Sequence, residues 1–511
     1  GDREDRGDEG GFSHIRGTKN NNSETRPYNY SIPNPIWNNE LYLELHRGCY
    51  TTHADQKRWN RRCEGLLYQA ELFASLATLI TQKNYPQTQL ETAWKNILFN
   101  QFHDILPGTS IPEVFIEANQ KWQQTETITQ TIIAESLNAI ASQITLPSPP
   151  HPNAQPLIIF NPLNWQHSEL IPLSLCEPLR FPLRTSALKK QIQITNNQSG
   201  QLYDSNGEKI PSQIGFHTNE AKNQTHLLFL AKDIPAIGYK IVWLCPTDTP
   251  PENDNPNPQP NNEFILENDY LRVIVNPNTG DLSSIFDKQN QREILSGAGN
   301  QLQAFEDKGQ YWDAWNIDPN YHQHPLPPTQ LKSIQWLEQG NLRSRLQVIR
   351  QLGQSQFCQD YILTSDSPLL KIATTVDWQE RQVLVKAAFP LTLEADYATY
   401  EIPCGAIQRP TKPQTPAEQA KWEVPALRWA DLADETYGVS LLNDCKYGYD
   451  AQPSQLRLTL LKSPMWPHPD ADRGIHHFTY ALYPHAGTWQ AAKTVQRGYE
   501  LNFPLQVVRL E

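Results

Sequence analysis

The sequence lacks several features that would place it in a specialised class of protein. No apolar run approaches the roughly 18 residues that a membrane-spanning helix needs, and no signal segment stands at the start. The seven Cys are scattered without a CxxC pair, which argues against a cysteine zinc site or a disulfide framework. With 43 basic against 55 acidic residues and no basic run, the net charge of -12 argues against a nucleic-acid partner. We therefore expect a protein of the cytoplasm with reduced thiols, without a membrane partner.

Common catalytic signatures are also missing. The chain has no glycine-rich phosphate loop, no nucleophile elbow and no HExxH motif. It does have many aromatic residues, with 14 Trp, 20 Tyr and 16 Phe. Its 511 residues exceed what a single hydrophobic core supports, so about three domains are expected.

Residues 37–145 have the pattern of a helical domain, and residues 1–36 read as a polar tail that is disordered or truncated. The segment LLYQAELFASLATLI has apolar residues at three- and four-residue spacing. A second helix is expected from Gln87 to Phe102. A third is expected to begin at a capping box over residues 110–113 (SIPE), where a Ser hydroxyl and a Glu carboxylate satisfy free amides. Three helices with short connections predict a small bundle.

The rest of the chain has the pattern of β-structure. A Pro-rich linker at 146–156 precedes a first β-sandwich region at 157–245. A second linker at 246–262 precedes a large C-terminal β-sandwich region at 263–511, in which NPNTG predicts a hairpin turn. Strands without intervening helices predict sandwiches rather than βαβ units. The fold class is therefore α+β and multidomain, a three-helix bundle followed by a large all-β sandwich region.

The stretch QFHDILPGTS (101–110) is unusual because the second helix runs into His-Asp and then into Pro-Gly. Pro107-Gly108 alone would end the helix, and a His near a helix C-terminus also complements the helix dipole. The pair therefore has an ordinary explanation as well as a functional one. Further polar-aromatic stretches are ELYLELHRGCYTT, FEDKGQYWDAWNID, YEIPCGAIQRPT, LNDCKYGYD and FTYALYPHAG. Aromatic rings beside carboxylates suit carbohydrate recognition, although any one ring is also a candidate for the core.

In their sequences and in their order along the chain these stretches resemble bacterial α-mannosidases of glycoside hydrolase family 38, and the resemblance runs from about Trp37 to about Pro504. The resemblance implies an N-terminal α/β catalytic domain, a three-helix middle domain and C-terminal β-sandwich domains; the first is absent from this chain. It also implies that His103 is a ligand of a catalytic zinc ion and that Asp104 binds sugar hydroxyls. The other zinc ligands and the nucleophile of this retaining reaction belong to the absent domain, so no catalytic residue is assignable.

The resemblance extends to residues expected at the rim of the active site, each of which also has a structural explanation. The proposed substrate-binding residues besides Asp104 are Tyr50, Asp313 and Trp315. Neighbouring positions of the same two stretches are His46, Arg47, Thr51 and Asp318.

Three functions remain open at this point. The first is a portion of an α-mannosidase that acts on mannosides or oligosaccharides, is inactive alone, and shares its zinc site with a separately encoded catalytic domain. The second is a non-catalytic carbohydrate-binding or interaction module that kept the fold. The third is the decaying product of a gene that lost its catalytic part.

Overall fold

The structure is a computed structural model that describes residues 36–174, 199–219, 222–247, 263–309 and 312–510. The described residues from Leu43 onward belong to one compact unit, and residues 36–42 belong to another. Within the latter, the indole of Trp37 donates a hydrogen bond to the carbonyl oxygen of Glu40 at 3.1 Å. Nearly all of the tail expected at 1–36 lies outside the described residues.

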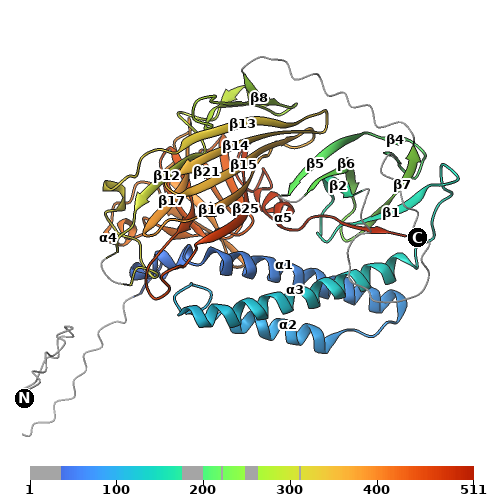
Figure 1. Ribbon diagram of the computed structural model, residues 1–511, viewed down its shortest axis with the longest axis horizontal. Helices are drawn as coiled ribbons and strands as arrows, with labels where there is room; N and C mark the ends of the chain where they lie inside the picture. Colours follow the sequence, from blue (N-terminus) through green and yellow to red (C-terminus); the bar gives the residue numbers. More distant parts are fainter. Residues whose placement is uncertain (1–35, 175–198, 220–221, 248–262, 310–311, 511) are drawn as a thin grey trace, which may run out of the picture. The chain divides into compact units, whose positions relative to one another are not determined.

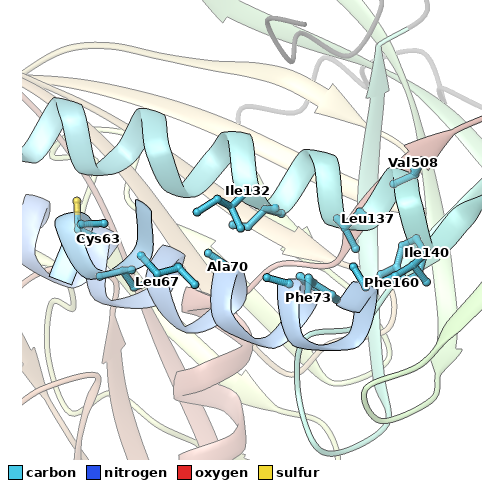
Figure 2. Close-up of a cluster of buried hydrophobic side chains, with 14 of the residues drawn as sticks. Cys63, Leu67, Ala70, Phe73, Ile132, Leu137, Ile140, Phe160 and Val508 are labelled. Carbon is cyan, nitrogen blue, oxygen red and sulfur yellow. The ribbon is translucent and has the colours of Figure 1, made fainter. Parts of the chain in front are cut away.

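The helical domain consists of α1 (Ala54–Thr81), α2 (Gln87–Asn100) and α3 (Pro112–Ala141), which lie side by side (Figure 1). Their apolar stripes meet in one buried cluster, as the periodicity predicts. Figure 2 shows this cluster, in which side chains of α1 and α3 face each other and are joined by Phe160 and Val508 from the β region. The three-helix bundle is confirmed.

The start of α3 differs from the prediction of a capping box at 110–113. Ile111 is the N-cap residue, and its side chain makes no capping hydrogen bond. Pro112 occupies the first helical turn, where its fixed φ suits the helix, so the boundary lies one residue beyond the Ser. A true capping box occurs at α4 (Pro416–Gln419), between Thr415 and Glu418.

The first β region contains two antiparallel sheets. One has the order β26-β1-β7-β3-β4 and the other β2-β6-β5. The strands are β1 (Gln155–Phe160), β2 (His167–Ser174), β3 (Ser199–Tyr203), β4 (Lys209–Ile210), β5 (Ser212–Asn219), β6 (Lys222–Ile234), β7 (Tyr239–Thr247) and β26 (Gln506–Arg509). Alternate residues of β1 and β2 pack into a shared core. The C-terminal strand β26 pairs with β1. The chain end therefore adds a strand to the first β region, whereas the bounds expected from the sequence include residues 506–509 in the C-terminal region.

The large β region contains three further sheets. Their orders are β11-β10-β9-β8, β12-β17-β24-β23-β20 and β13-β14-β15-β16-β25-β22-β21-β18-β19. The first two comprise β8 (Phe264–Glu267), β9 (Leu271–Val275), β10 (Leu282–Asp287), β11 (Arg292–Glu293), β12 (Gln301–Glu306), β17 (Val383–Pro390), β20 (Val424–Pro425), β23 (Gly448–Gln452) and β24 (Gln455–Lys462). The nine-stranded sheet comprises β13 (Gln330–Gln339), β14 (Arg343–Leu352), β15 (Ser355–Thr364), β16 (Leu370–Trp378), β18 (Tyr397–Ile402), β19 (Gly405–Pro410), β21 (Trp429–Ala433), β22 (Tyr437–Asn443) and β25 (Gly474–Ala486). Short helices η1 (Glu44–His46), η2 (Gly48–Tyr50), η3 (Tyr321–Gln323) and α5 (Thr494–Asn502) complete the described elements.

The hairpin predicted from NPNTG is confirmed. Strands β9 and β10 pair antiparallel, and the N–H of Gly280 donates to the carbonyl oxygen of Asn276 at 2.9 Å. The predicted all-β character of the region after the bundle is confirmed as well. In the parts of the chain that the structure describes, no helix combines the length and the apolar character of a membrane span.

Candidate functional site

The His-Asp pair lies in a run of turns directly after α2. The N–H of Ile105 donates to the carbonyl oxygen of Phe102 at 2.9 Å, and the N–H of Gly108 donates to that of Ile105 at 3.0 Å. These are turn contacts rather than a continuation of the helix, so the side chains of residues 103 and 104 leave the regular surface of α2.

Gly108 allows this turn to approach the chain that precedes α1. Its φ is +86°, and a Cβ built there would lie 2.5 Å from the carbonyl oxygen of Thr52 and 2.7 Å from Cβ of His53. Only glycine combines this backbone conformation with such a close approach. The Lys57 ammonium reinforces the contact by donating to the carbonyl oxygens of Thr52 and, at 2.8 Å, Leu106.

His103 is an exposed imidazole and Asp104 is a partly fixed carboxylate. The His103 side chain is 77% exposed and that of Asp104 is 40% exposed, and Nε2 lies 3.5 Å from Oδ2. The Thr109 hydroxyl donates to Oδ1 of Asp104 at 3.1 Å. One Asp104 oxygen is therefore held within the turn and the other faces His103 and solvent.

His103 suits one position of a metal site but does not complete one. An exposed imidazole is an effective ligand for zinc, and a catalytic zinc usually takes three protein ligands. Within the described ranges no group of three His, Cys, Asp or Glu side chains could hold a metal ion. Any complete site at His103 therefore needs donors from outside these ranges.

The segment before α1 joins this turn to the β region. The N–H groups of Gly48 and Cys49 donate to the carbonyl oxygen of Trp315 at 2.7 and 3.3 Å. The Thr52 hydroxyl donates to the carbonyl oxygen of Ala314 at 2.8 Å. Tyr50, which lies between these contacts, is half-buried. Tyr50 and Trp315 therefore lie on adjoining segments, and the turn with His103 packs against the same stretch.

Cys49 lies within electrostatic reach of Asp104. Burial raises the pKa of its thiol to about 11; Lys57 and Lys462 oppose this rise, and Asp104 adds to it. The thiol is therefore neutral at physiological pH and is no nucleophile.

The other predicted residues of this segment are packed into the protein. The buried guanidinium of Arg47 donates to the carbonyl oxygen of Ala420, at 3.1 Å from Nε and 2.6 Å from Nη2, and lies over the Trp422 ring at 4.5 Å. Thr51 is buried and His46 is half-buried. These contacts give Arg47 a structural role, because its guanidinium is fixed by the segment that contains Ala420 and Trp422.

Asp313 is buried and anchors a distant loop. Its Oδ2 accepts a hydrogen bond from the N–H of Met465 at 2.6 Å, and its Oδ1 accepts one from the N–H of Trp466 at 3.0 Å. Its carbonyl oxygen accepts from the Lys462 ammonium. Asp318 shapes a turn, because its Oδ1 accepts from the N–H of Asn320 at 2.9 Å. Both carboxylate oxygens of Asp313 are therefore engaged within the protein, unlike those of Asp104.

Two exposed tryptophans that the sequence reasoning did not select lie beside Trp315. Trp312 is 58% exposed and Trp466 is 50% exposed. The rings of Trp315 and Trp466 stack with centroids 5.4 Å apart, and Trp312 meets Trp466 edge-on at 4.8 Å. The available signal was SPMWPHPDADRG, a Trp among prolines in a polar loop between two strands.

The same loop is fastened to the start of α1. Asp472 accepts hydrogen bonds from the N–H groups of His53 and Ala54 at 2.7 and 2.6 Å, and thereby caps the helix from a distant part of the sequence. The Nδ1 atom of His468 lies 2.9 Å from Nε2 of His53. The bundle, the loop at 463–473 and the turn at 312–316 are thus one connected structure.

Comparisons with known proteins assign this architecture. Residues 44–140 match the model of the alpha mannosidase middle domain, and residues 266–470 match that of the glycosyl hydrolases family 38 C-terminal domain. Alpha-mannosidase 2C1 of Homo sapiens is 33% identical over 484 residues, which cover 92% of this chain and 41% of the human protein. Alpha-mannosidase G of Dictyostelium discoideum is 29% identical, with 91% of this chain and 43% of that protein covered.

The fold also has a solved counterpart. The crystal structure of an alpha-mannosidase from Enterococcus faecalis superposes with a TM-score of 0.74 at 17% identity, covering 91% of this chain and 58% of that one. The chain thus spans about two fifths of the length of the curated relatives that it matches. It belongs to glycoside hydrolase family 38, of which it carries the α-mannosidase middle domain and the C-terminal domain.

Proposed function

We propose that this chain is the C-terminal portion of a retaining, zinc-dependent α-mannosidase and is inactive without an α/β catalytic domain. The observation that carries the proposal is the exposed His103–Asp104 pair, presented by a glycine-dependent turn in the middle domain of this family. The nucleophile and the remaining zinc ligands would come from the catalytic domain. We also propose that the protein acts in the cytoplasm, since the described cysteines are free thiols.

The two residues of the pair have different roles in this proposal. His103 supplies one imidazole ligand, and its exposed ring leaves room for donors from another domain. A zinc ion bound there would supply Lewis acidity toward sugar hydroxyls. Asp104 has one oxygen held by Thr109, so the other is available to accept a hydrogen bond from a hydroxyl of the mannoside.

The surface around the pair suits a protein partner. Five apolar side chains at the end of α2 and the start of α3 are each more than half exposed, from 52% to 62%: Leu98, Phe99, Phe102, Ile111 and Ile116. Apolar patches of this kind on a soluble protein commonly mark interaction sites. The proposed occupant is the catalytic domain, because the patch adjoins the incomplete metal site through the contact of Phe102 with His103 and the chain covers 41% of its human relative.

The test is complementation. Purified chain with zinc and an aryl α-mannoside is expected to show no turnover above that of His103→Ala. Adding the α/β catalytic domain of a family member is expected to restore zinc-dependent cleavage. His103→Ala should lower the restored activity by at least about a hundredfold, as expected for loss of a metal ligand. His322→Ala, which changes an exposed histidine, should leave the restored activity unchanged.

Two variants check the docking surface in the same assay. Phe99→Ser should weaken complementation, whereas Leu79→Ser should not, because Leu79 is also an exposed apolar residue (80% against 58% for Phe99) but lies at the opposite end of the bundle. Turnover by the chain alone would overturn the proposal. A second candidate, a carbohydrate-binding module without catalysis, is favoured by the exposed Trp312 and Trp466, and sugar binding without complementation would support it.

A further inference from the structure

Trp312, Trp315 and Trp466 form an aromatic cluster, which we call the tryptophan face. Trp315 is its half-buried base, stacked on Trp466 at 5.4 Å and met edge-on by Trp312 at 5.5 Å. Trp312 and Trp466 retain 58% and 50% of their surface exposed. Large indoles usually bury most of their area, so two exposed rings on a half-buried third one are a feature that folding alone does not require.

Backbone contacts and backbone conformation fix the positions of both exposed rings. The Asp313 carboxylate accepts from the N–H of Trp466 and of the residue before it. Trp312 has a φ of 57°, a left-handed conformation that is unfavourable for a bulky residue. Strained residues of this kind persist only where the surrounding structure fixes them, often at ligand sites. Both rings are therefore pre-positioned rather than left free in solvent.

The position of the tryptophan face connects it to the His103–Asp104 pair. The carbonyl oxygen of Trp315 accepts from the N–H groups of Gly48 and Cys49. Four residues later, the carbonyl oxygen of Thr52 lies against Gly108 in the turn that carries the pair. Residues 48–52 thus join the backbone of Trp315 to the turn that carries the pair.

The chemistry of indole faces selects a sugar ring as the ligand. The face of an aromatic ring carries partial negative charge, and one side of a pyranose presents axial C–H groups with partial positive charge. A flat stack of this kind needs rigid, exposed rings, and carboxylates or amides nearby then bind the hydroxyls. A protein surface would instead require a wider apolar patch, whereas the immediate supports of these rings are Asp313 and backbone groups.

We propose that Trp312 and Trp466, whose rings stand at 75° to each other, form two sides of a site in which one indole stacks on a pyranose ring of the mannoside and the other contacts its edge, and that Asp313 is the positioning residue that fixes Trp466. The identity of the sugar rests on the function proposed above. The stacking itself does not require zinc or the catalytic domain, so it is testable on the chain alone.

The experiment measures binding of methyl α-D-mannoside and of an α-linked mannobiose to the full chain by saturation-transfer NMR. Trp466→Ala and Trp312→Ala should each weaken binding by about tenfold, the order expected for loss of one aromatic stack. Trp466→Phe should retain most of the affinity. The matched control is Tyr397→Ala, an aromatic side chain that is 55% exposed and lies on β18, outside the tryptophan face.

The positioning role of Asp313 has its own signature. Indoles about 5 Å apart couple in the circular dichroism spectrum near 230 nm, and Trp466→Ala should remove this couplet. Asp313→Asn should reduce both the couplet and the mannoside affinity while the unfolding transition stays cooperative. A merely structural Asp313 would change the transition but leave the couplet of the folded protein intact.

Three outcomes would overturn the proposal. The first is that the wild-type chain does not bind mannoside at a ligand concentration of tens of millimolar. The second is that both Trp variants bind mannoside as well as the wild-type chain does. The third is that the Trp variants weaken binding of the catalytic domain but not of the sugar. Failure of complementation alone would contradict the proposed enzyme function and leave the stacking result standing. Loss of mannoside binding in the Trp variants but not in His103→Ala would separate the two sites directly.

Discussion

At the residue scale, His167 shows how a single side chain links two parts of the chain. It lies on β2, is 6% exposed, and has Nε2 3.6 Å from Oε2 of Glu169 and Nδ1 3.5 Å from Oε1 of Glu500 on α5. Burial lowers the pKa of the imidazole, but the two carboxylates outweigh burial and raise it to about 9. His167 is therefore a buried cation at neutral pH and joins the first β region to the C-terminal helix.

This arrangement predicts a pH-dependent contribution to stability. The folded-state pKa of about 9 lies above the ordinary 6.5, so the stabilisation is fully present below about pH 6.5 and is lost as the pH rises through 9. His167→Gln should lower the free energy of unfolding at pH 6 by roughly 2–3 kcal/mol. Urea titrations should show this difference shrinking to less than about 1 kcal/mol at pH 10. A difference that is the same at both pH values would contradict the ion-pair account, and His322→Gln serves as the exposed control.

The residues of the candidate site differ in how readily the sequence identifies them. His103 and Asp104 were identified because a short local motif contains them together with the Pro-Gly that ends the helix. Trp466 was missed, because its position depends on two backbone N–H groups that donate to Asp313. Every residue except proline carries such an N–H group, so no pattern in the sequence encodes the contact. The assignment of His103 to zinc and of Asp104, Tyr50, Asp313 and Trp315 to substrate stays a prediction.

At the element scale, the turn after α2 depends on one glycine, which predicts a specific cost of substitution. Gly108→Ala places a Cβ 2.5 Å from the carbonyl oxygen of Thr52, in addition to the unfavourable φ of +86°. We expect a loss of roughly 2–4 kcal/mol of stability and a displaced His103 that weakens zinc-dependent complementation. Gly207→Ala is the matched control, because its φ is +81° but the nearest atom to its added Cβ lies 3.8 Å away.

The difference between these two variants isolates the close contact from the backbone strain. Gly207→Ala should cost about 1 kcal/mol, the amount expected for a left-handed position alone, as measured by thermal unfolding. Equal losses for the two variants would show that the approach to Thr52 is relaxed in solution and is not what positions the turn.

Whole elements were predictable where their pattern is local. The three helices followed from apolar spacing, and the β9–β10 hairpin followed from NPNTG, because both signals lie within about 20 residues. The start of α3 was misplaced because Pro112 and a capping box compete for the same turn, and the proline sets the boundary. The cap of α1 could not be predicted, since it is Asp472 from a loop of the β region.

At the scale of the whole molecule, residues of the first β region contribute to the hydrophobic core of the bundle. The cluster inside the bundle includes Ile158 and Phe160 of β1 and Val508 of β26 (Figure 2). Neighbouring residues of the same strands point the other way, as the period of two requires, and Leu157 and Ile159 belong to the sandwich core. Strands β1 and β26 therefore pack into two cores at once, and buried contacts cross the boundary expected near residue 156.

A pair of adjacent substitutions tests this shared core. Val508 is 6% exposed and packs into the bundle cluster, whereas Val507 packs against the sandwich core. Each Val→Ala change should lower the free energy of unfolding by roughly 1–2 kcal/mol, because it removes buried methyl groups. Hydrogen exchange should separate them: Val508→Ala should raise exchange in α1 and α3, and Val507→Ala should raise it in β2 and β6. If Val508→Ala affects β26 alone, the bundle is stable without the chain end. The C-terminal strand would then pair with the first sheet without stabilising the contact between that sheet and the middle domain.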